Sequence, residues 1–235
     1  MNTRPLLCEL HAHTTWSDGE LTLTELVDLY GMHRFDVLCV TDHVLPEGAP
    51  YLTAAAHARY VAAIEREARR AREQYDLLLL PGLELTFGHE DPDKAAHALV
   101  IGTRSWIPLE HGLEHALCVA HGEGAVIAAH PHGRLPDPKA VRTTRWFWRN
   151  RDRIGDLVDR WEIVNRGQTF GWIAELGLPP IASGDFHRRE HLETWKTFVP
   201  CRKSERDLVA YLRSAQPTYI VPWHLRPSRE LREAA

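Results

Sequence analysis

Short apolar runs alternate along this chain with longer segments that mix hydrophobic and polar positions. Each apolar run has the length and composition of a buried strand, and the runs end at Leu10-His11, Val40-Thr41, Leu80-Pro81, Ile101, Ala129-His130, Val164-Asn165 and near Ala182-Ser183. The segments between them predict helices over residues 22–34, 53–75, 110–122, 149–158 and 204–214. Thr22 and Glu25 have the spacing of a capping box, which supports the start of the first helix.

The order of these elements predicts an α/β fold. Strands that alternate with helices usually pair in parallel, through right-handed crossovers. Six or seven such units in one chain favour a barrel over an open sheet. The sequence contains no long linker, internal repeat or low-complexity stretch, so we expect residues 1–235 to form one domain.

Composition and charge narrow the class of protein. The formal net charge is −4, whereas a dedicated nucleic-acid binder is usually basic. No apolar run approaches the ~20 residues that span a bilayer, and the N-terminal residues do not resemble a leader peptide. The four cysteines (Cys8, Cys39, Cys118 and Cys201) are far apart, and Cys8 and Cys39 lie in apolar runs as buried thiols would. We therefore expect a cytoplasmic protein with no membrane partner.

Histidine is the one residue type with an abnormal count, 15 in all. His11 and His13 follow the first strand, and residues two apart in a strand point to the same side. The pairs His130/His132 and Asp185/His187 repeat this spacing after later strands. Further candidates are His43 in Thr41-Asp42-His43, Glu84 after Pro81-Gly82-Leu83, Asp18 in Ser17-Asp18-Gly19, and His97 at the start of an apolar run.

The position of these groups predicts a metal site. Except for Asp18 and His97, each group follows the end of a strand, and in β/α barrels the active site is built at that rim. One such histidine alone is more often an ordinary core or loop residue, but so many together are not. Histidine and carboxylate ligands suit zinc, manganese or iron, and the number of groups exceeds what one tetrahedral ion needs. The sequence therefore predicts two or three divalent ions held by His11, His13, Asp18, His43, Glu84, His97, His130, Asp185 and His187.

The other histidines lie in helices or polar loops, and we expect them to be solvated: residues 33, 57, 89, 111, 115, 121, 191 and 224. His89 is a possible exception, because it precedes His97 in a loop that we place on the same rim.

The motifs together resemble those of the PHP (polymerase and histidinol phosphatase) domain family. They are His11-x-His13-Thr14, Ser17-Asp18-Gly19, Thr41-Asp42-His43, Pro81-Gly82-x-Glu84, His130-Pro131 and Gly184-Asp185-x-His187. They occur in the family's order over residues 9–187, and as a set they are highly specific. The resemblance implies a distorted (β/α)7 barrel with up to three ions. Phe186 replaces the usual small or polar residue between two ligands, which narrows the expected pocket.

The resemblance also implies how the ligands are shared in a trinuclear site. One ion would be held by His11, His13, Glu84 and Asp185, a second by Glu84, His97 and His130, and the third by Asp18, His43 and His187. Family members hydrolyse small phosphomonoesters, nucleotides or nucleic-acid ends, and a few are degenerate modules of polymerases that have lost ligands. Every expected ligand type is present in this chain, which favours activity.

The sequence thus predicts a metal-dependent phosphoric ester hydrolase. Its substrate would be a small phosphomonoester or nucleotide, attacked by metal-activated water. Two alternatives stay open: a phosphodiesterase or exonuclease that acts on short oligonucleotides, and a non-catalytic metal-bound docking module. An amidohydrolase shares the HxH pair but not the Ser-Asp-Gly and Thr-Asp-His motifs.

A basic segment directly after His130 bears on the substrate. Residues 133–153 contain seven Lys or Arg and two Asp, a balance of +5 in an acidic protein. Arg134 and Arg166 are the predicted substrate-binding residues, because guanidinium groups bind phosphate with two parallel hydrogen bonds. The aromatic triplet 146–148 would either stack a nucleobase or form the buried face of a helix, and the sequence leaves both open.

Overall fold

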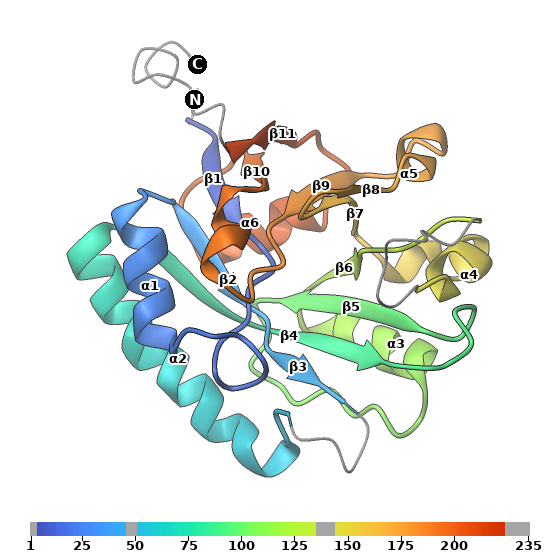
Figure 1. Ribbon diagram of the computed structural model, residues 1–235, viewed down its shortest axis with the longest axis horizontal. Helices are drawn as coiled ribbons and strands as arrows, with labels where there is room; N and C mark the ends of the chain where they lie inside the picture. Colours follow the sequence, from blue (N-terminus) through green and yellow to red (C-terminus); the bar gives the residue numbers. More distant parts are fainter. Residues whose placement is uncertain (1–3, 46–50, 135–143, 224–235) are drawn as a thin grey trace.

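Eleven strands form one sheet in the described part of the chain, residues 4–45, 51–134 and 144–223 of the computed structural model (Figure 1). The sheet order is β11-β10-β1-β2-β4-β5-β6-β7-β8, with β3 paired to β4 and β9 to β7. The strands are β1 (Leu6–Glu9), β2 (Val37–Val40), β3 (His43–Val44), β4 (Leu78–Phe87), β5 (Ala96–Ile101), β6 (Ala125–Ala129), β7 (Arg160–Asn165), β8 (Gln168–Thr169), β9 (Pro180–Ser183), β10 (Trp195–Val199) and β11 (Tyr219–Pro222).

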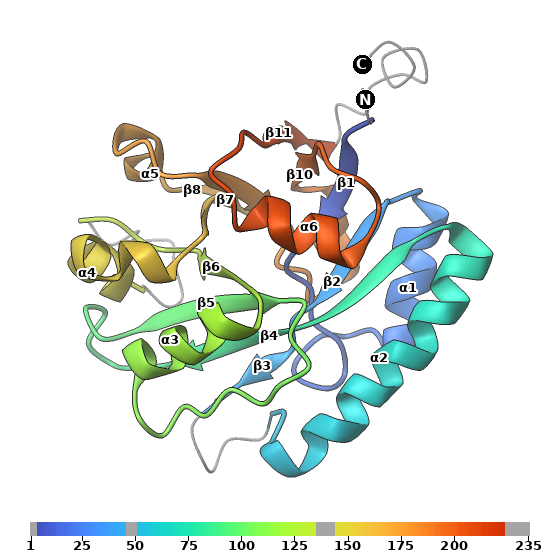
Figure 2. The same ribbon diagram turned by 180° about the vertical axis from the view of Figure 1, so that it is seen from behind.

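The helices are α1 (Leu23–Met32), α2 (Ala54–Tyr75), α3 (Leu113–Glu123), α4 (Trp146–Ile154), α5 (Trp172–Glu175) and α6 (Glu205–Leu212), with short 3-10 turns at Gly155–Leu157 and Arg189–Glu193. Helices α1, α2 and α3 cover the outer face of this sheet, whereas α6 packs on its inner face (Figures 1 and 2). The capping box that begins α1 is confirmed: the Glu25 backbone N–H donates to Thr22 Oγ1, and the Thr22 N–H donates to Glu25. None of the described helices is long and apolar enough to cross a membrane.

Strand pairing is mixed, so the expectation of parallel pairing throughout is wrong. The pairs β1-β2, β2-β4, β6-β7 and β7-β9 are parallel, but β4-β5, β5-β6, β1-β10 and β10-β11 are antiparallel. Only residues 88–95 connect β4 to β5, which is too short for a helical crossover and produces a hairpin. Because β5 runs antiparallel to both of its neighbours, its first residues lie at the edge of the sheet where β4 and β6 end.

The sheet curls until its distant parts meet. Ala12, after β1, forms a parallel bridge with Phe186, after β9. Within the strands themselves, the Thr197 hydroxyl in β10 accepts from the N–H of Ala182 in β9 at 2.8 Å and donates to the Ala182 carbonyl at 2.7 Å. A mixed α/β fold with a curled sheet is therefore confirmed and is consistent with a distorted barrel. The number of strand–helix units in that barrel stays a prediction.

Alternating strand residues face two separate apolar clusters. In β1, Leu6 and Cys8 belong to an inner cluster that Leu208 and Leu212 of α6 complete, while Leu7 belongs to the outer cluster beneath α1, α2 and α3. Cys8 and Cys39 are buried free thiols, as expected. Cys201 is also a buried free thiol, whereas Cys118 is exposed. Burial of both faces fixes the strands, and so the side chains that follow them, in one position.

Candidate metal centre

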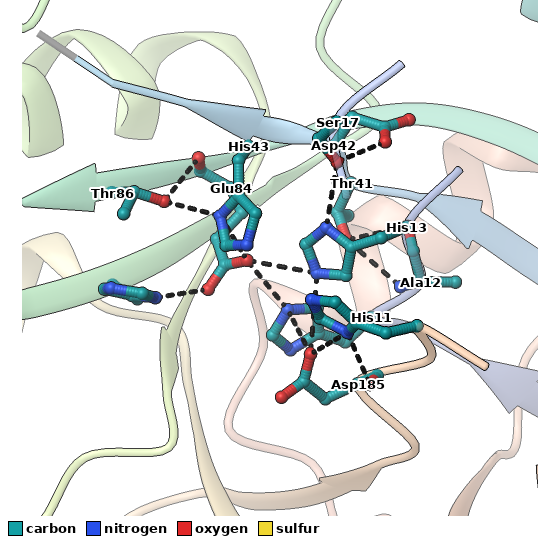
Figure 3. Close-up of polar contacts among 12 residues, drawn as sticks. His11, Ala12, His13, Ser17, Thr41, Asp42, His43, Glu84, Thr86 and Asp185 are labelled. Carbon is teal, nitrogen blue, oxygen red and sulfur yellow. Dashed lines mark hydrogen bonds and ion pairs between the residues drawn. The ribbon is translucent and has the colours of Figure 1, made fainter. Parts of the chain in front are cut away.

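Glu84 is the centre of the candidate site (Figure 3). It lies within β4 and is fully buried. Its carboxylate oxygens lie 2.8–3.3 Å from nitrogens of five histidine rings: His11, His13 and His43 at one oxygen, and His97 and His130 at the other. A single carboxylate therefore joins residues from β3 and β5 and from the segments after β1 and β6.

Asp185 completes the most buried group of ligands. Its Oδ1 lies 3.4 Å from His11 Nε2 and 3.5 Å from His13 Nε2. The chain turns sharply after β9, and Asp185 has a φ of 43°, which turns its carboxylate toward the two rings. His11, His13 and Asp185 converge closely enough to hold one ion, and Glu84 contacts both histidines.

A second cluster of ligands lies at the more exposed side. Asp18 Oδ1 is 3.3 Å from His187 Nε2 and 3.6 Å from His43 Nε2. These three residues come from separate segments, and His13 lies with them close enough to share an ion. The side chain of Asp18 is 34% exposed, whereas that of His13 is fully buried. The site is thus open at Asp18 and closed at His13.

His97 and His130 form the remaining corner. His43, Glu84 and His97 converge closely enough to hold an ion, and the rings of His97 and His130 are 4.8 Å apart. The antiparallel direction of β5 explains why His97, at the start of its strand, lies beside residues that follow parallel strands. All nine predicted ligands are therefore brought together in one cluster.

The donor atoms fit a divalent cation. His13 Nε2 is buried and has no hydrogen-bond partner, although it lies 3.1 Å from a Glu84 oxygen. Leaving a buried ring nitrogen unpaired is costly, and a cation between the nitrogen and the carboxylates would remove that cost. Neutral imidazoles and carboxylates are the ligands that zinc, manganese and iron accept.

Electrostatics keeps the carboxylates of the site ionised. Burial by itself raises the pKa of Glu84, but His43, His11 and His97 lower it well below its usual range. The pKa of Asp185 is also held well below its usual range, because His11, His13 and His187 outweigh its burial. Both carboxylates are therefore available in the ionised form that binds a cation.

The histidines of the site divide by their surroundings. Burial, opposed by Glu84, lowers the pKa of His43 to about 3, so its ring is neutral and has a lone pair available. At His187, hydrogen bonds that the ring donates to Asp18 and Asp185 outweigh burial and raise the pKa to about 10. His187 consequently has to lose a proton before one of its ring nitrogens can bind a metal ion.

Glu162 supports the ligands from beneath, and the sequence did not single it out. Its Oε1 lies 2.9 Å from His11 Nδ1, and its Oε2 accepts the His130 backbone N–H at 2.6 Å. Asn165 and Ser183 also donate to it. A carboxylate behind a metal-binding histidine fixes the ring orientation. The signal for this role is an acidic residue that is buried between Trp161 and Ile163 in the middle of a strand, Arg160–Asn165.

Glu9 has a similar position under the turn that carries Asp185. Its Oε1 accepts the backbone N–H of Gly184 at 2.9 Å and of His11 at 3.3 Å. Its Oε2 pairs with Lys196 Nζ at 2.8 Å, and both side chains are fully buried. A Cβ on Gly184 would clash with both groups, so glycine is required there. The ion pair therefore joins β1 to β10, and its Glu9 carboxylate also holds the backbone at His11 and just before Asp185.

Arg166 reaches the site, where its guanidinium contacts the candidate ligand Asp185. Its Nη2 lies 3.0 Å from Asp185 Oδ2, and its Nε donates to the Asp185 carbonyl at 3.1 Å. Arg134 is exposed and lies four residues beyond His130. Substrate binding by these two arginines stays a prediction.

Two expectations for other histidines, His132 and His57, are wrong. His132 does not join the cluster: β6 ends at Ala129, and His130 has a φ of 30°, so the two side chains diverge and His132 packs against Phe170. His57 is buried in α2 rather than solvated, because its ring packs near Trp106.

His89 is exposed, and its Nδ1 accepts the Asp91 N–H at 2.9 Å, so it takes no part in the site. Residue 224, another histidine expected to be solvated, lies outside the described residues.

Solved structures with the same fold are known. The chain aligns with a two-domain protein from Bacteroides vulgatus that contains a predicted PHP-like metal-dependent phosphoesterase, with a TM-score of 0.66 and 18% identity over 94% of this chain. A second match, an inferred metal-dependent phosphoesterase from Bifidobacterium adolescentis, has a TM-score of 0.51 and 17% identity, and covers 77% of this chain and 87% of the other. The chain has a PHP-like fold.

The PHP-like fold agrees with the family resemblance of the motifs. No family model matches the chain, and no curated protein does. The chain spans 65% of the length of the two-domain Bacteroides protein. At these identities the likeness concerns the fold, and the nine converging side chains carry the argument about chemistry.

Proposed function

We propose that this protein is a metal-dependent phosphoesterase that hydrolyses a small phosphomonoester or a nucleotide. The observation that carries the proposal is the convergence of five histidine rings on the buried carboxylate of Glu84. A structural role for so many ionisable groups in one place is costly, because each must be desolvated. Structural neighbours with the same fold are described as metal-dependent phosphoesterases, which supports the same reading.

The chain's own residues would hold two to three divalent ions of manganese, zinc or iron. We assign one ion to His11, His13, Glu84 and Asp185, a second to Glu84, His97 and His130, and a third to Asp18, His43 and His187. Such ions, when bound, activate water for attack and neutralise charge on the phosphate.

The exposure of the ligands indicates where the substrate enters. The side chains of Asp18, His187 and His130 are 34%, 18% and 16% exposed, whereas those of His11 and His13 are fully buried. A phosphate would therefore approach from the side of Asp18 and His187. Arg166, at 38% exposure, lies on that side beside Asp185 and can offer its remaining N–H groups to a phosphate oxygen.

Metal content and substrate range together test this proposal. We expect protein purified without chelator to contain at least two divalent ions per chain by elemental analysis. We also expect it to release phosphate from phosphomonoesters when assayed with manganese against a panel that includes dinucleotides. Fewer than one ion per chain, with no activity restored by manganese or zinc, would contradict it. Full metal content with no hydrolysis of any phosphate ester would favour the docking module instead.

The third ion site has a separate test. Asp18→Asn keeps the size of the side chain but removes the negative charge that attracts a cation. We expect this variant to fold with near-normal thermal stability, to keep the other ions, and to lose at least ~100-fold in kcat, comparable to the loss of one electrostatic stabiliser. Asp156→Asn, at an exposed position in the 3-10 turn Gly155–Leu157, is the matched control. Full activity with the third site demonstrably empty would refute a catalytic role for Asp18.

A further inference from the structure

His13 lies between the two clusters of ligands and presents a different ring nitrogen to each. Its Nε2 lies 3.1 Å from Glu84 Oε2 and 3.5 Å from Asp185 Oδ1, in the buried cluster. Its Nδ1 lies 3.8 Å from Asp18 Oδ1, in the more exposed cluster. A neutral imidazole has a lone pair available on only one of its two nitrogens, so the tautomer of His13 decides which ion the ring can bind.

Ser17 contacts the Nδ1 side of this ring. Its Oγ lies 2.6 Å from Asp42 Oδ1 and 3.4 Å from His13 Nδ1 (Figure 3). A hydroxyl has one proton to donate, and the carboxylate is both the nearer and the stronger acceptor. Ser17 therefore donates to Asp42, and its oxygen accepts from an N–H at His13 Nδ1. The lone pair of His13 is then at Nε2, a buried atom that makes no hydrogen bond to any described residue.

The Asp42 carboxylate is surrounded by donors. Besides the Ser17 hydroxyl, it accepts the Thr14 backbone N–H at 2.9 Å and the Thr14 hydroxyl at 2.8 Å. The Thr14 hydroxyl accepts in turn from the Trp16 N–H at 3.1 Å, so its own proton is directed at Asp42. Burial raises the pKa of Asp42, and the hydrogen bonds from Ser17 and Thr14 oppose that shift. Three donors around one buried carboxylate stabilise its ionised form, which accepts from Ser17.

The loop that carries Asp18 turns tightly against His13. The backbone N–H groups of Ser17 and Gly19 both donate to the Thr14 carbonyl at 3.0 Å. A Cβ on Gly19 would overlap the His13 carbonyl, so glycine is required at this position. Because the turn fixes the Ser17 backbone beside His13, the Ser17 hydroxyl can contact both the ring and the carboxylate behind it.

We propose that Ser17, held by the Asp42 carboxylate, is a positioning residue that fixes the tautomer of His13. With its proton held at Nδ1, His13 serves the ion of the buried cluster through Nε2 and contributes nothing to the ion at Asp18. The ions rest on the proposed function, whereas the tautomer is a property of the chain itself. A carboxylate behind a metal-binding histidine usually contacts the ring directly, and here a hydroxyl lies between them.

Nuclear magnetic resonance measures the tautomer directly. In full-length protein with nitrogen-15-labelled histidine, couplings between ring nitrogens and carbon-bound protons show which nitrogen bears a proton or an ion. We expect zinc-loaded protein to have the His13 proton at Nδ1 and the ion at Nε2. We expect metal-free protein at about pH 9, where imidazoles are ordinarily neutral, to keep the proton at Nδ1. The His13 signals are those missing from His13→Asn. An ion at Nδ1, or a metal-free ring with its proton at Nε2, overturns the proposal.

Removing the hydroxyl tests the role of Ser17. In Ser17→Ala we expect the proton of the metal-free ring to move to Nε2, where Glu84 is the nearest acceptor. One zinc ion should then bind at least ~10-fold more weakly in competition with a chelator, as is typical when the contact behind a ligand is lost. Ser17→Thr keeps a hydroxyl and should restore both readouts. Weaker zinc binding with an unchanged tautomer would mean that Ser17 acts only on the loop, and the proposal would fail.

The matched control is Ser105→Ala. The Ser105 hydroxyl also donates to a carboxylate at 2.6 Å, that of Glu123, at an exposed position outside the metal centre. We expect this variant to keep the wild-type tautomer and zinc affinity, and an equal loss in it would overturn a specific role for Ser17. A protein that hydrolyses no phosphate ester would overturn the proposed function but leave this proposal standing if His13 has its proton at Nδ1. Hydrolysis by a protein with the other tautomer would overturn this proposal alone.

Discussion

Replacing Glu84 with glutamine is expected to lower kcat by at least ~1,000-fold, more than any single histidine replacement in the site. Glutamine keeps the shape of the side chain but removes the charge that two proposed ion sites share. In the wild type, Oε2 serves His11, His13 and His43, while Oε1 serves His97 and His130. No other residue of the cluster contacts so many ligands, so its loss should reduce metal content by more than one ion per chain.

The comparison that decides this prediction is with His97→Asn. His97 belongs to one proposed ion site, so its replacement should remove one ion at most and cost less activity than Glu84→Gln. Both are measured by elemental analysis and by steady-state kinetics on one phosphomonoester. Circular dichroism should show that both variants keep their secondary structure. A Glu84→Gln enzyme with full metal content and wild-type kcat would show that the carboxylate is structural.

The sequence predicted the positions of most strands and helices, because hydrophobic periodicity depends on local sequence. Each predicted strand end coincides with an observed strand except near Leu80-Pro81, where β4 continues to Phe87. Two of the missed strands, β10 and β11, have a physical explanation. The charge of Lys196 interrupts the apolar pattern of β10, and β11 is an apolar run of only four residues that lies partly exposed at the end of the sheet.

Pairing direction was not predictable in the same way. It depends on how a connection crosses the sheet, and the short loop 88–95 forces an antiparallel hairpin between β4 and β5. That direction is also what brings His97 to the rim, although it precedes most of its strand. His97 was a candidate at the start of an apolar run and lies in the cluster, but the geometric rule of strand ends did not account for it.

Most members of the cluster were predictable from the sequence because they lie in short motifs next to strand ends. Their supporting residues were not, because Glu9 and Glu162 act through contacts with distant segments. Glu162 meets His11 from 151 positions away, and Glu9 meets Gly184 from 175 positions away. His132 shows the opposite error: the local spacing was right, but a left-handed turn at His130 moved its side chain away.

The buried pair of Glu9 and Lys196 gives the largest expected effect on stability. Lys196→Met keeps the length and volume of the side chain but leaves the Glu9 carboxylate buried without a counter-charge. Both side chains are fully buried, and Lys196 Nζ lies 2.8 Å from Glu9 Oε2. Burial lowers the pKa of Lys196, and the Glu9 carboxylate opposes that shift. Breaking such a pair from one side costs ~3–5 kcal/mol in the free energy of unfolding. We expect urea unfolding of the metal-loaded protein to show a loss of this size, whereas Lys94→Met, at an exposed position, should change stability by less than ~0.5 kcal/mol.

Removing both charges should recover most of this loss. In Glu9→Gln/Lys196→Met, the glutamine carbonyl oxygen can still accept the Gly184 N–H, and its amide N–H can donate to the Tyr30 hydroxyl, which lies 3.0 Å from the Glu9 carboxylate. No uncompensated charge remains, so we expect the double variant to be ~2–3 kcal/mol more stable than Lys196→Met alone, since a buried pair is often replaceable as a unit. If Lys196→Met instead unfolds at the wild-type urea concentration, the Glu9 carboxylate must become hydrated or protonated at little cost. The ion pair would then have no part in holding the backbone at His11 and Gly184 in place.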